Sequence, residues 1–193
     1  MEYAKKALDT KQWLQFLREN LDKDVDKHMD WELWLYKPGM PPIEVPKNKL
    51  IEDCERAADL CKKGDGLEEF KDLYQGFIPK QSEYFFRLLW HSDEPLKHST
   101  LDKIEEIFQF STSKNARIRL GFSIICLKAK YERFIDSVFE FLNTYGVMKF
   151  VRPMYKLLAQ WPEQKERAIA NFLQKRASMY PTTAKMIASD LAL

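Results

Sequence analysis

The sequence has few cysteines and no long uncharged segment. Its three cysteines, Cys54, Cys61 and Cys126, are an odd number without CxxC spacing. Neither a disulfide framework nor a thiolate zinc site is therefore indicated, and a reducing compartment is expected. No stretch approaches the roughly 18 uncharged apolar residues that a transmembrane helix needs, and residues 1–10 lack an apolar signal segment. We therefore expect a soluble, cytoplasmic protein without a membrane partner.

Glycine and strand-like patterns are also scarce. Only 6 of the 193 residues are glycine, and alternating runs of Val, Ile and Thr bounded by turns are absent. Apolar residues recur instead at helical spacing almost everywhere. Short connections between helices favour antiparallel hairpins, which stack into a two-layer superhelix. The sequence thus predicts an all-α fold of about ten helices, a single domain over residues 1–193 built as an armadillo- or HEAT-like α-solenoid.

Neither sign of charge is in clear excess. Lys and Arg number 31 against 29 Asp and Glu, and a net charge of +2 is too small to indicate a nucleic-acid or membrane partner by bulk electrostatics. Four basic residues between positions 115 and 130 alternate with apolar ones, and a solvated helix face is the preferred interpretation. Nucleic-acid binding through that face is kept as an alternative, which salt-dependent binding would reveal. The four residues are Arg117, Arg119, Lys128 and Lys130.

Capping residues and prolines predict where the helices begin and end. A first helix is expected to start at Asp9 or Thr10, and Gly146 is expected to follow the end of a later helix. Residues 99–102, Ser-Thr-Leu-Asp, resemble a capping box with Asp in place of Glu. Residues 38–46 hold four of the nine prolines and are expected to form an extended connection. First helical turns are expected at Pro79, Pro153, Pro162 and Pro181.

Residue patterns for catalysis are missing. His28, His91 and His98 have no i, i+4 spacing, and HExxH, GxSxG, P-loop and GxGxxG motifs are absent. Zinc hydrolysis, serine acyl transfer and nucleotide chemistry therefore lack their minimum parts. We interpret the histidines as surface or capping residues, and Cys54 and Cys61 as core residues on one apolar helix face. No catalytic residue, metal ligand or cofactor is predicted in this chain.

One group of cations differs from an ordinary solvated face. Lys149 and Arg152 lie between Gly146 and Pro153, in the expected connection or first turn of a helix. Cations beside the free N–H groups of a helix N-terminus suit a carboxylate ligand. Because Lys and Arg are common near helix ends for structural reasons, the residues alone leave a carboxylate site and a structural role both open.

Three segments of the sequence resemble motifs of one family. Residues 31–42, WELWLYKPGMPP, resemble W-x-x-W-L-x-x-P-G-x-P-P, and residues 146–153, GVMKFVRP, resemble G-R-M-K-F-x-R-P. Residues 176–181, RASMYP, resemble K-A-S-M-H-P, and residues 188–191, ASDL, follow them. The family is the leukotriene A4 hydrolase and aminopeptidase family of zinc metallopeptidases, and the motifs are those of its C-terminal domain. The resemblance extends from Asp9 to Leu191.

The resemblance implies a role beside a catalytic domain. In the family, a thermolysin-like domain with HExxH and a distal Glu binds zinc and precedes a two-layer, armadillo-like helical domain. This sequence contains none of the zinc machinery, so zinc is expected in a catalytic domain of the same parent chain, which is also the expected partner. The helical domain is expected to be inactive alone, to form one wall of the substrate cleft and to help bind a peptide carboxylate. Epoxide hydrolysis by the parent would depend on residues outside this chain.

The resemblance also assigns residues. Lys149 matches the family's Lys and is expected to bind the carboxylate at the C-terminus of a peptide substrate, while Val147 stands where the family has Arg. A bidentate contact is therefore missing. Arg152 matches the Arg before Pro and is expected to support the turn more than to touch substrate. Structural or docking roles are expected for Trp31, Trp34, Pro38, Gly39, Pro41, Pro42, Gly146 and Pro153; ordinary core packing is the alternative for the two tryptophans.

An alternative of another class stays open. A free-standing α-solenoid could bind other proteins through its concave surface and have no peptidase partner. The reading frame before Met1 separates the two hypotheses, because an encoded HExxH motif would support the enzyme domain.

Overall fold

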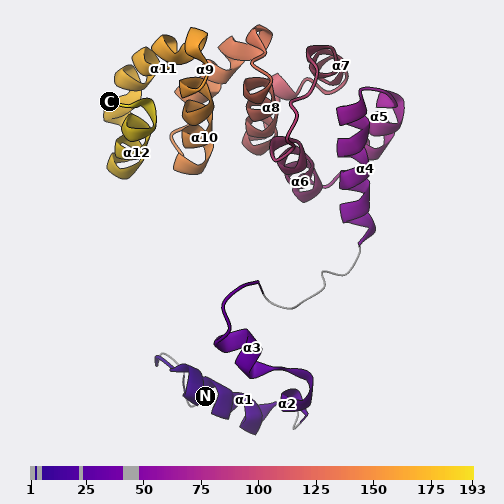
Figure 1. Ribbon diagram of the computed structural model, residues 1–193, viewed down its shortest axis with the longest axis vertical. Coiled ribbons are helices and arrows are strands. Elements are labelled where there is room, and N and C mark those ends of the chain that lie inside the picture. The colour runs from indigo at the N-terminus through magenta and orange to yellow at the C-terminus, as the bar shows by residue number, and fades with distance from the viewer. Residues whose placement is uncertain (1–2, 4–5, 22–23, 41–47) are drawn as a thin grey trace. The chain divides into compact units, whose positions relative to one another are not determined.

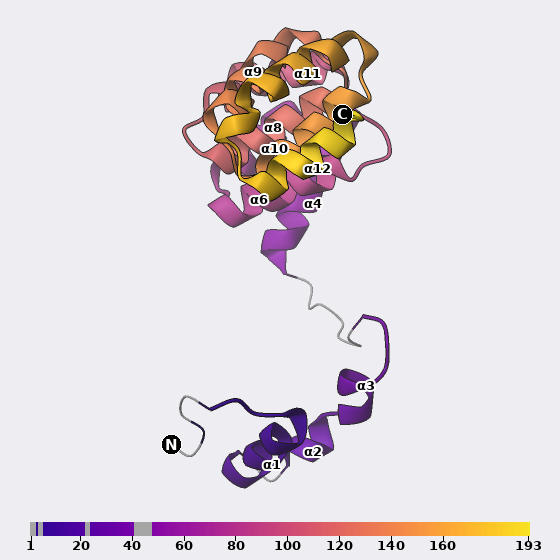
Figure 2. The ribbon, with the colours of Figure 1, turned by 90° about the vertical axis from the view of Figure 1, so that its left-hand side faces the viewer.

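The computed structural model describes residues 3, 6–21, 24–40 and 48–193. Within these ranges it contains twelve α-helices, three short 3-10 helices and no β-strand, which confirms the all-α prediction. The chain divides into two compact units, residues 1–46 and 47–193 (Figures 1 and 2). That residues 1–193 form one domain stays a prediction. Among the described helices, none is long and apolar enough to cross a membrane.

The first unit contains three helices, α1 (Thr10–Asn20), α2 (Val25–His28) and α3 (Trp31–Leu35). Helix α1 begins where the sequence predicts, because the Asp9 carboxylate accepts a hydrogen bond from the Gln12 N–H at 2.8 Å. The Gln12 side chain in turn accepts from the Asp9 N–H at 3.1 Å, which completes a capping box. The Trp13 and Trp31 rings meet edge to face, with centroids 5.8 Å apart.

The Trp31 to Gly39 segment is shaped by local contacts. The Trp31 indole N–H donates to Asp26 at 2.6 Å, and Trp34 is 36% exposed. Gly39 has φ +118°, a conformation that side-chain-bearing residues rarely adopt, which explains the glycine after Pro38. The predicted docking role of this segment stays a prediction, and its two other named residues, Pro41 and Pro42, lie outside the described residues.

The second unit is a stack of helices in two layers, as the sequence predicts. Consecutive even-numbered helices contact one another from α4 to α12, and the odd-numbered helices cover their other side (Figure 1). One layer contains α4 (Lys49–Lys63), α6 (Pro79–Trp90), α8 (Ala116–Lys128), α10 (Met148–Ala159) and α12 (Pro181–Leu191). The other contains α5 (Leu67–Gln75), α7 (His98–Phe108), α9 (Ile135–Thr144) and α11 (Pro162–Lys175).

Helix α8 joins two halves of the core. Phe122 and Ile125 belong to a cluster with the helices before α8, whereas Ile124 and Leu127 belong to a cluster with the helices after it. Because α8 is apolar on two sides, it holds both halves of the stack together. All three cysteines are buried in this unit, as free thiols; burial raises the pKa of Cys54 to about 11, so these thiols are core residues rather than nucleophiles.

Helix α10 begins earlier than predicted. It starts at Met148, so that Pro153 lies inside the helix and not in its first turn. Pro153 has no N–H to bond the Lys149 carbonyl four residues earlier, which normally ends a helix. Here the buried side chains of Val151 and Met154, on either side of the proline, pack into the core and keep the helix continuous.

The predicted capping box at residues 99–102 is also wrong. Helix α7 begins at His98, with Lys97 as its N-cap and no side-chain cap. Thr100 is instead buried inside the helix, and Asp102 accepts a hydrogen bond from the Tyr131 hydroxyl at 2.8 Å. The Asp102 carboxylate therefore makes a tertiary contact instead of capping the helix, as the sequence pattern had predicted.

Candidate functional site

Lys149 lies in the first turn of α10. The N-cap residue, Val147, has no side chain that could bond the free N–H groups of this turn. The Lys149 side chain is exposed, and its Nζ lies 5.4 Å from the centre of the Phe150 ring. In the part of the chain that the structure describes, no carboxylate oxygen lies within 4 Å of this nitrogen. The ammonium group is therefore available to a ligand.

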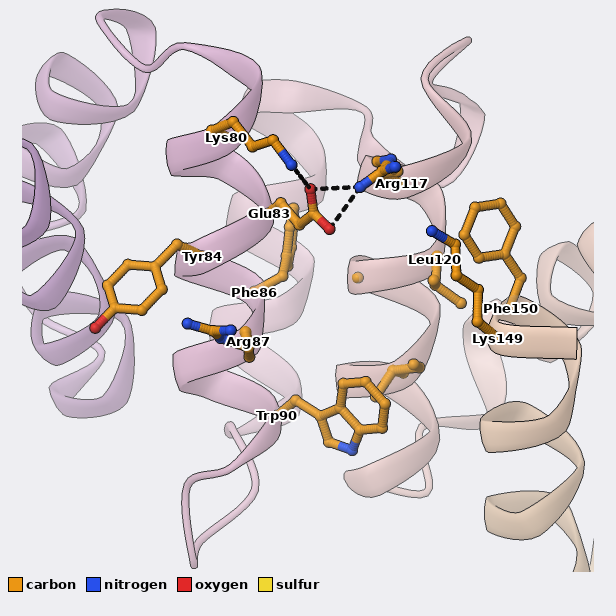
Figure 3. Close-up of a pocket in the computed structure, with 12 residues that line it drawn as sticks. Lys80, Glu83, Tyr84, Phe86, Arg87, Trp90, Arg117, Leu120, Lys149 and Phe150 are labelled. Atoms are coloured by element: carbon orange, nitrogen blue, oxygen red, sulfur yellow. Dashed lines mark hydrogen bonds and ion pairs between the residues drawn. The ribbon is translucent and has the colours of Figure 1, made fainter. Parts of the chain in front are cut away.

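A cavity of about 370 Å³ lies beside Lys149, between α6, α8 and the start of α10 (Figure 3). A second, more open hollow of about 730 Å³ is lined mainly by α10, and Lys149 and Trp90 line both. The first is lined by Lys80, Glu83, Tyr84, Phe86, Arg87 and Trp90 of α6, Arg117, Leu120, Gly121 and Ile124 of α8, and Lys149 and Phe150 of α10. The second is lined by Trp90, Val147, Met148, Lys149, Arg152, Pro153, Lys156, Leu157 and Gln160.

An ion pair spans the top of the first cavity. Both carboxylate oxygens of Glu83 lie 2.7 Å from Nη1 of Arg117, and Nζ of Lys80 lies 3.5 Å from Oε2 of Glu83 (Figure 3). The hydrogen bond from Arg117 lowers the pKa of the Glu83 carboxyl, which keeps it ionised at neutral pH. The pair therefore neutralises Arg117 and leaves the cavity cationic.

Arg152 faces a partner inside the fold. Its Nε and Nη2 donate to the two oxygens of Asp190 on α12, at 2.6 Å and 3.2 Å, and Lys156 lies 3.7 Å from the same carboxylate. Asp190 is only 12% exposed, and the bond from Arg152 lowers its pKa. The structure thus joins Arg152 to α12, where its bidentate donors are already occupied.

The residues around Lys149 give the motif its local shape. Gly146 directly follows Tyr145, the C-cap residue of α9. A Cβ atom added at Gly146 would have no other atom within 4 Å. Val147 is 49% exposed and lines the second hollow. At the position where the family pattern has Arg, this chain therefore presents an apolar side chain to the hollow.

The basic residues of α8 are mostly bound within the chain. Arg117 is paired with Glu83, and Lys128 donates to the carbonyl oxygens of Trp90 and Ser92 at 2.7 Å and 2.5 Å. Arg119 is only 12% exposed and lies over the Phe141 ring. These contacts support a structural role, because a phosphate backbone needs a row of available cations.

Metal-ligating side chains do not gather in the described residues: no group of three His, Cys, Asp or Glu there could hold a metal ion. Nε2 of His98 lies 2.9 Å from the Ala129 carbonyl oxygen, and its ring stacks on Tyr131. The described residues therefore do not fit a zinc centre.

Sequence reasoning missed the α6 wall of the cavity. Tyr84, Arg87 and Trp90 lie three residues apart, on a face of α6 distinct from the buried residues Phe85 and Leu89. An arginine between two aromatic residues on the less buried face of an amphipathic helix was the available signal.

A family model described as leukotriene A4 hydrolase, C-terminal, matches residues 77–191. Among curated relatives, leukotriene A-4 hydrolase of Xenopus laevis is 26% identical over 199 residues, covering 98% of this chain and 32% of the relative. Leucine aminopeptidase 2-2 of Scheffersomyces stipitis is 32% identical over 204 residues, covering 97% of this chain and 32% of the relative.

Solved structures show the same relationship. A structure of native yeast leukotriene A4 hydrolase matches with a TM-score of 0.83 and 28% identity, over 100% of this chain and 34% of that chain. A native leukotriene A4 hydrolase structure from Saccharomyces cerevisiae gives 0.80 and 27%, with the same coverage. This chain thus spans about a third of the length of the proteins it matches. Because the family model covers more than half of the chain, the chain belongs to the leukotriene A4 hydrolase C-terminal family.

Proposed function

We propose that this chain forms one wall of the substrate cleft of a zinc aminopeptidase and that Lys149 binds the C-terminal carboxylate of a peptide substrate. The observation that carries the proposal is the exposed ammonium of Lys149 beside a cavity, with no carboxylate oxygen within 4 Å among the described residues, at the motif position where the family has its lysine. The names of the relatives, a leukotriene A-4 hydrolase and leucine aminopeptidases, support the reaction class.

The contacts of the neighbouring side chains favour Lys149 over Arg152 as the residue that binds the carboxylate. Arg152 already binds Asp190 through two hydrogen bonds, so using it for a substrate would break that pair. The Val147 side chain offers no hydrogen-bond donor. Recognition then rests on one ammonium group without a guanidinium beside it. Losing a charged hydrogen bond costs about 1.5–3 kcal/mol, or roughly ten- to a hundredfold in affinity, so we expect weaker carboxylate binding than in relatives with both cations.

The proposal assigns the zinc chemistry to a catalytic domain of the same parent chain. A zinc ion bound there would supply an activated water for peptide hydrolysis. The residues of this chain position the carboxylate end of the peptide and exclude substrates that are too large for the cleft. Cytoplasmic location belongs to the proposal as well.

Lys149→Ala in the protein expressed from its full reading frame tests the carboxylate role. We expect KM for free-acid tripeptides to rise about tenfold, while KM for the same tripeptides with an amidated C-terminus stays unchanged. Lys156→Ala is the matched control, because it removes the same charge two turns later on α10. Its KM values should stay near those of the unsubstituted protein. Equal effects of Lys149→Ala on acids and amides would defeat the carboxylate role, and a reading frame without HExxH would defeat the enzyme-domain hypothesis.

A further inference from the structure

The α6 wall of the cavity carries a second exposed cation. Tyr84, Arg87 and Trp90 line it from successive turns of the helix. The guanidinium carbon of Arg87 lies 5.0 Å from the centre of the Tyr84 ring. This cation–π contact orients the arginine without neutralising it. In Figure 3 the Arg87 guanidinium points toward Tyr84, on the side of α6 away from Lys149.

The charges that line the cavity do not balance. Its cations are Lys80, Arg87, Arg117 and Lys149, and its one carboxylate is that of Glu83. Glu83 is bonded to Arg117 and lies near Lys80. Across the described ranges, neither Arg87 nor Lys149 has a carboxylate oxygen within 4 Å of its side-chain nitrogens. Two cations of the cavity are therefore without a counter-charge.

These two cations stand on different walls. Figure 3 shows Arg87 on α6 and Lys149 on α10, with Leu120 of α8 between the two helices. Two cations on opposite walls of a cavity suit two separate anionic groups rather than one shared carboxylate. The aromatic rings of Tyr84 and Trp90 beside Arg87 also offer apolar surface to the methylene groups of a bound side chain.

We infer that Arg87 binds a second carboxylate of the same peptide, the side chain of a Glu or Asp in its last or next-to-last residue. The inference rests on the proposed function and names its substrate class: peptides with an acidic C-terminal end. A guanidinium suits this role because its planar donors pair with a carboxylate through two hydrogen bonds. Arg87 acts as a specificity-determining residue, while Lys149 holds the terminal carboxylate.

The role of Arg87 can be tested by measuring peptide binding to the protein expressed from its full reading frame. The ligands are four tripeptides that end in Gly-Glu, Gly-Gln, Glu-Gly and Gln-Gly, each with its first amide reduced to a CH2–NH group so that it cannot be hydrolysed. Titration calorimetry gives their dissociation constants. We expect at least one Glu peptide to bind about tenfold tighter than its Gln counterpart. Arg87→Gln should remove that preference and leave the affinity for the Gln peptide unchanged.

Two further variants separate the possible causes. Lys80→Gln removes a cation from the same helix and cavity, and it should keep the preference for Glu, which excludes a general effect of positive charge. Lys149→Gln should weaken all four peptides by a common factor and keep their ratios, which is the mark of the terminal-carboxylate role alone. A preference that survives Arg87→Gln, no preference in the unsubstituted protein, or an equal loss for Glu and Gln peptides in Arg87→Gln would overturn the Arg87 inference. Binding of none of the four peptides would overturn both proposals.

Discussion

The α6–α8 and α10–α12 contacts, on the two sides of Lys149, differ in the interactions that stabilise them. Between α6 and α8 the packing is close and apolar: a Cβ atom on Gly121 would lie only 2.4–2.6 Å from side-chain atoms of Phe86. Between α10 and α12 a partly buried ion pair adds to the apolar packing, with Arg152 bonded to Asp190. The α6–α8 contact thus depends on the absence of a side chain at Gly121, and its ion pair, Arg117 with Glu83, is exposed, whereas the ion pair between α10 and α12 is more buried.

The difference explains which cations are available for binding. On α10, Arg152 has a carboxylate opposite it on α12 and serves the fold. Lys149, one turn earlier, faces the cavity and has no such carboxylate among the residues that the structure describes. On α6 and α8, Arg117 has Glu83 opposite it, whereas Arg87, within the described ranges, contacts the ring of Tyr84 and has no carboxylate opposite it. The presence of an opposing carboxylate, rather than the residue type, separates structural cations from candidate binding cations.

The largest effect on stability is expected from Gly121→Ala. Alanine normally stabilises a helix by up to about 1 kcal/mol relative to glycine, but here its Cβ would meet the buried Phe86 ring near its root. Overpacking of this kind costs about 1–3 kcal/mol, so the free energy of unfolding should fall in a denaturant titration. Gly146→Ala is the control, because nothing lies within 4 Å of its added Cβ. Equal unfolding free energies for the two variants would show that the α6–α8 contact can widen freely.

A smaller loss is expected from Asp190→Asn. The substitution leaves Arg152 partly buried without its counter-charge, so the thermal midpoint should fall. The matched control is Asp136→Asn, which removes an ion pair of the same 2.6 Å length to Arg167, but at a carboxylate that is 85% exposed. Exposed ion pairs contribute little to the free energy of unfolding, so this variant should lose little stability. A midpoint loss in Asp136→Asn as large as in Asp190→Asn would remove the distinction between the two kinds of pair.

The smallest of these effects is a dependence of stability on pH. Arg152 lowers the pKa of Asp190 in the folded protein below its ordinary value of 3.8. The pair therefore contributes fully above pH 3.8, and its contribution is lost as the pH falls through the lowered value. The midpoint difference between the unsubstituted protein and Asp190→Asn should be constant near neutral pH and should shrink below about pH 3.8. A difference that persisted unchanged to lower pH would show that the carboxylate charge of Asp190 does not stabilise the fold.

Much of the fold could be predicted from local sequence signals. Asp9 caps α1 through a capping box, and Gly64, with φ +76°, ends α4 as a left-handed residue. The helical spacing of apolar residues predicted the two-layer stack. The boundaries at Pro153 and at residues 99–102 were wrong because tertiary packing overrode the local preference, through the buried neighbours Val151 and Met154 in the first case and through the bond from Tyr131 to Asp102 in the second.

The candidate site was less predictable. The motif around Lys149 pointed to one residue, but the sequence could not show that Arg152 would be bound by Asp190, 38 positions later. Nor could it show that α6 brings Arg87 to the same cavity as Lys149, 62 positions apart in the sequence. Such pairings depend on how helices stack, which helical spacing alone does not determine.

The most direct test of carboxylate binding by Lys149 is a crystal structure of the protein expressed from its full reading frame, with an unhydrolysable free-acid tripeptide bound. We expect the Lys149 ammonium to lie within about 4 Å of the terminal carboxylate of the peptide, while Arg152 remains bonded to Asp190. A terminal carboxylate held by other residues, with the Lys149 ammonium pointing away from the peptide, would contradict this expectation.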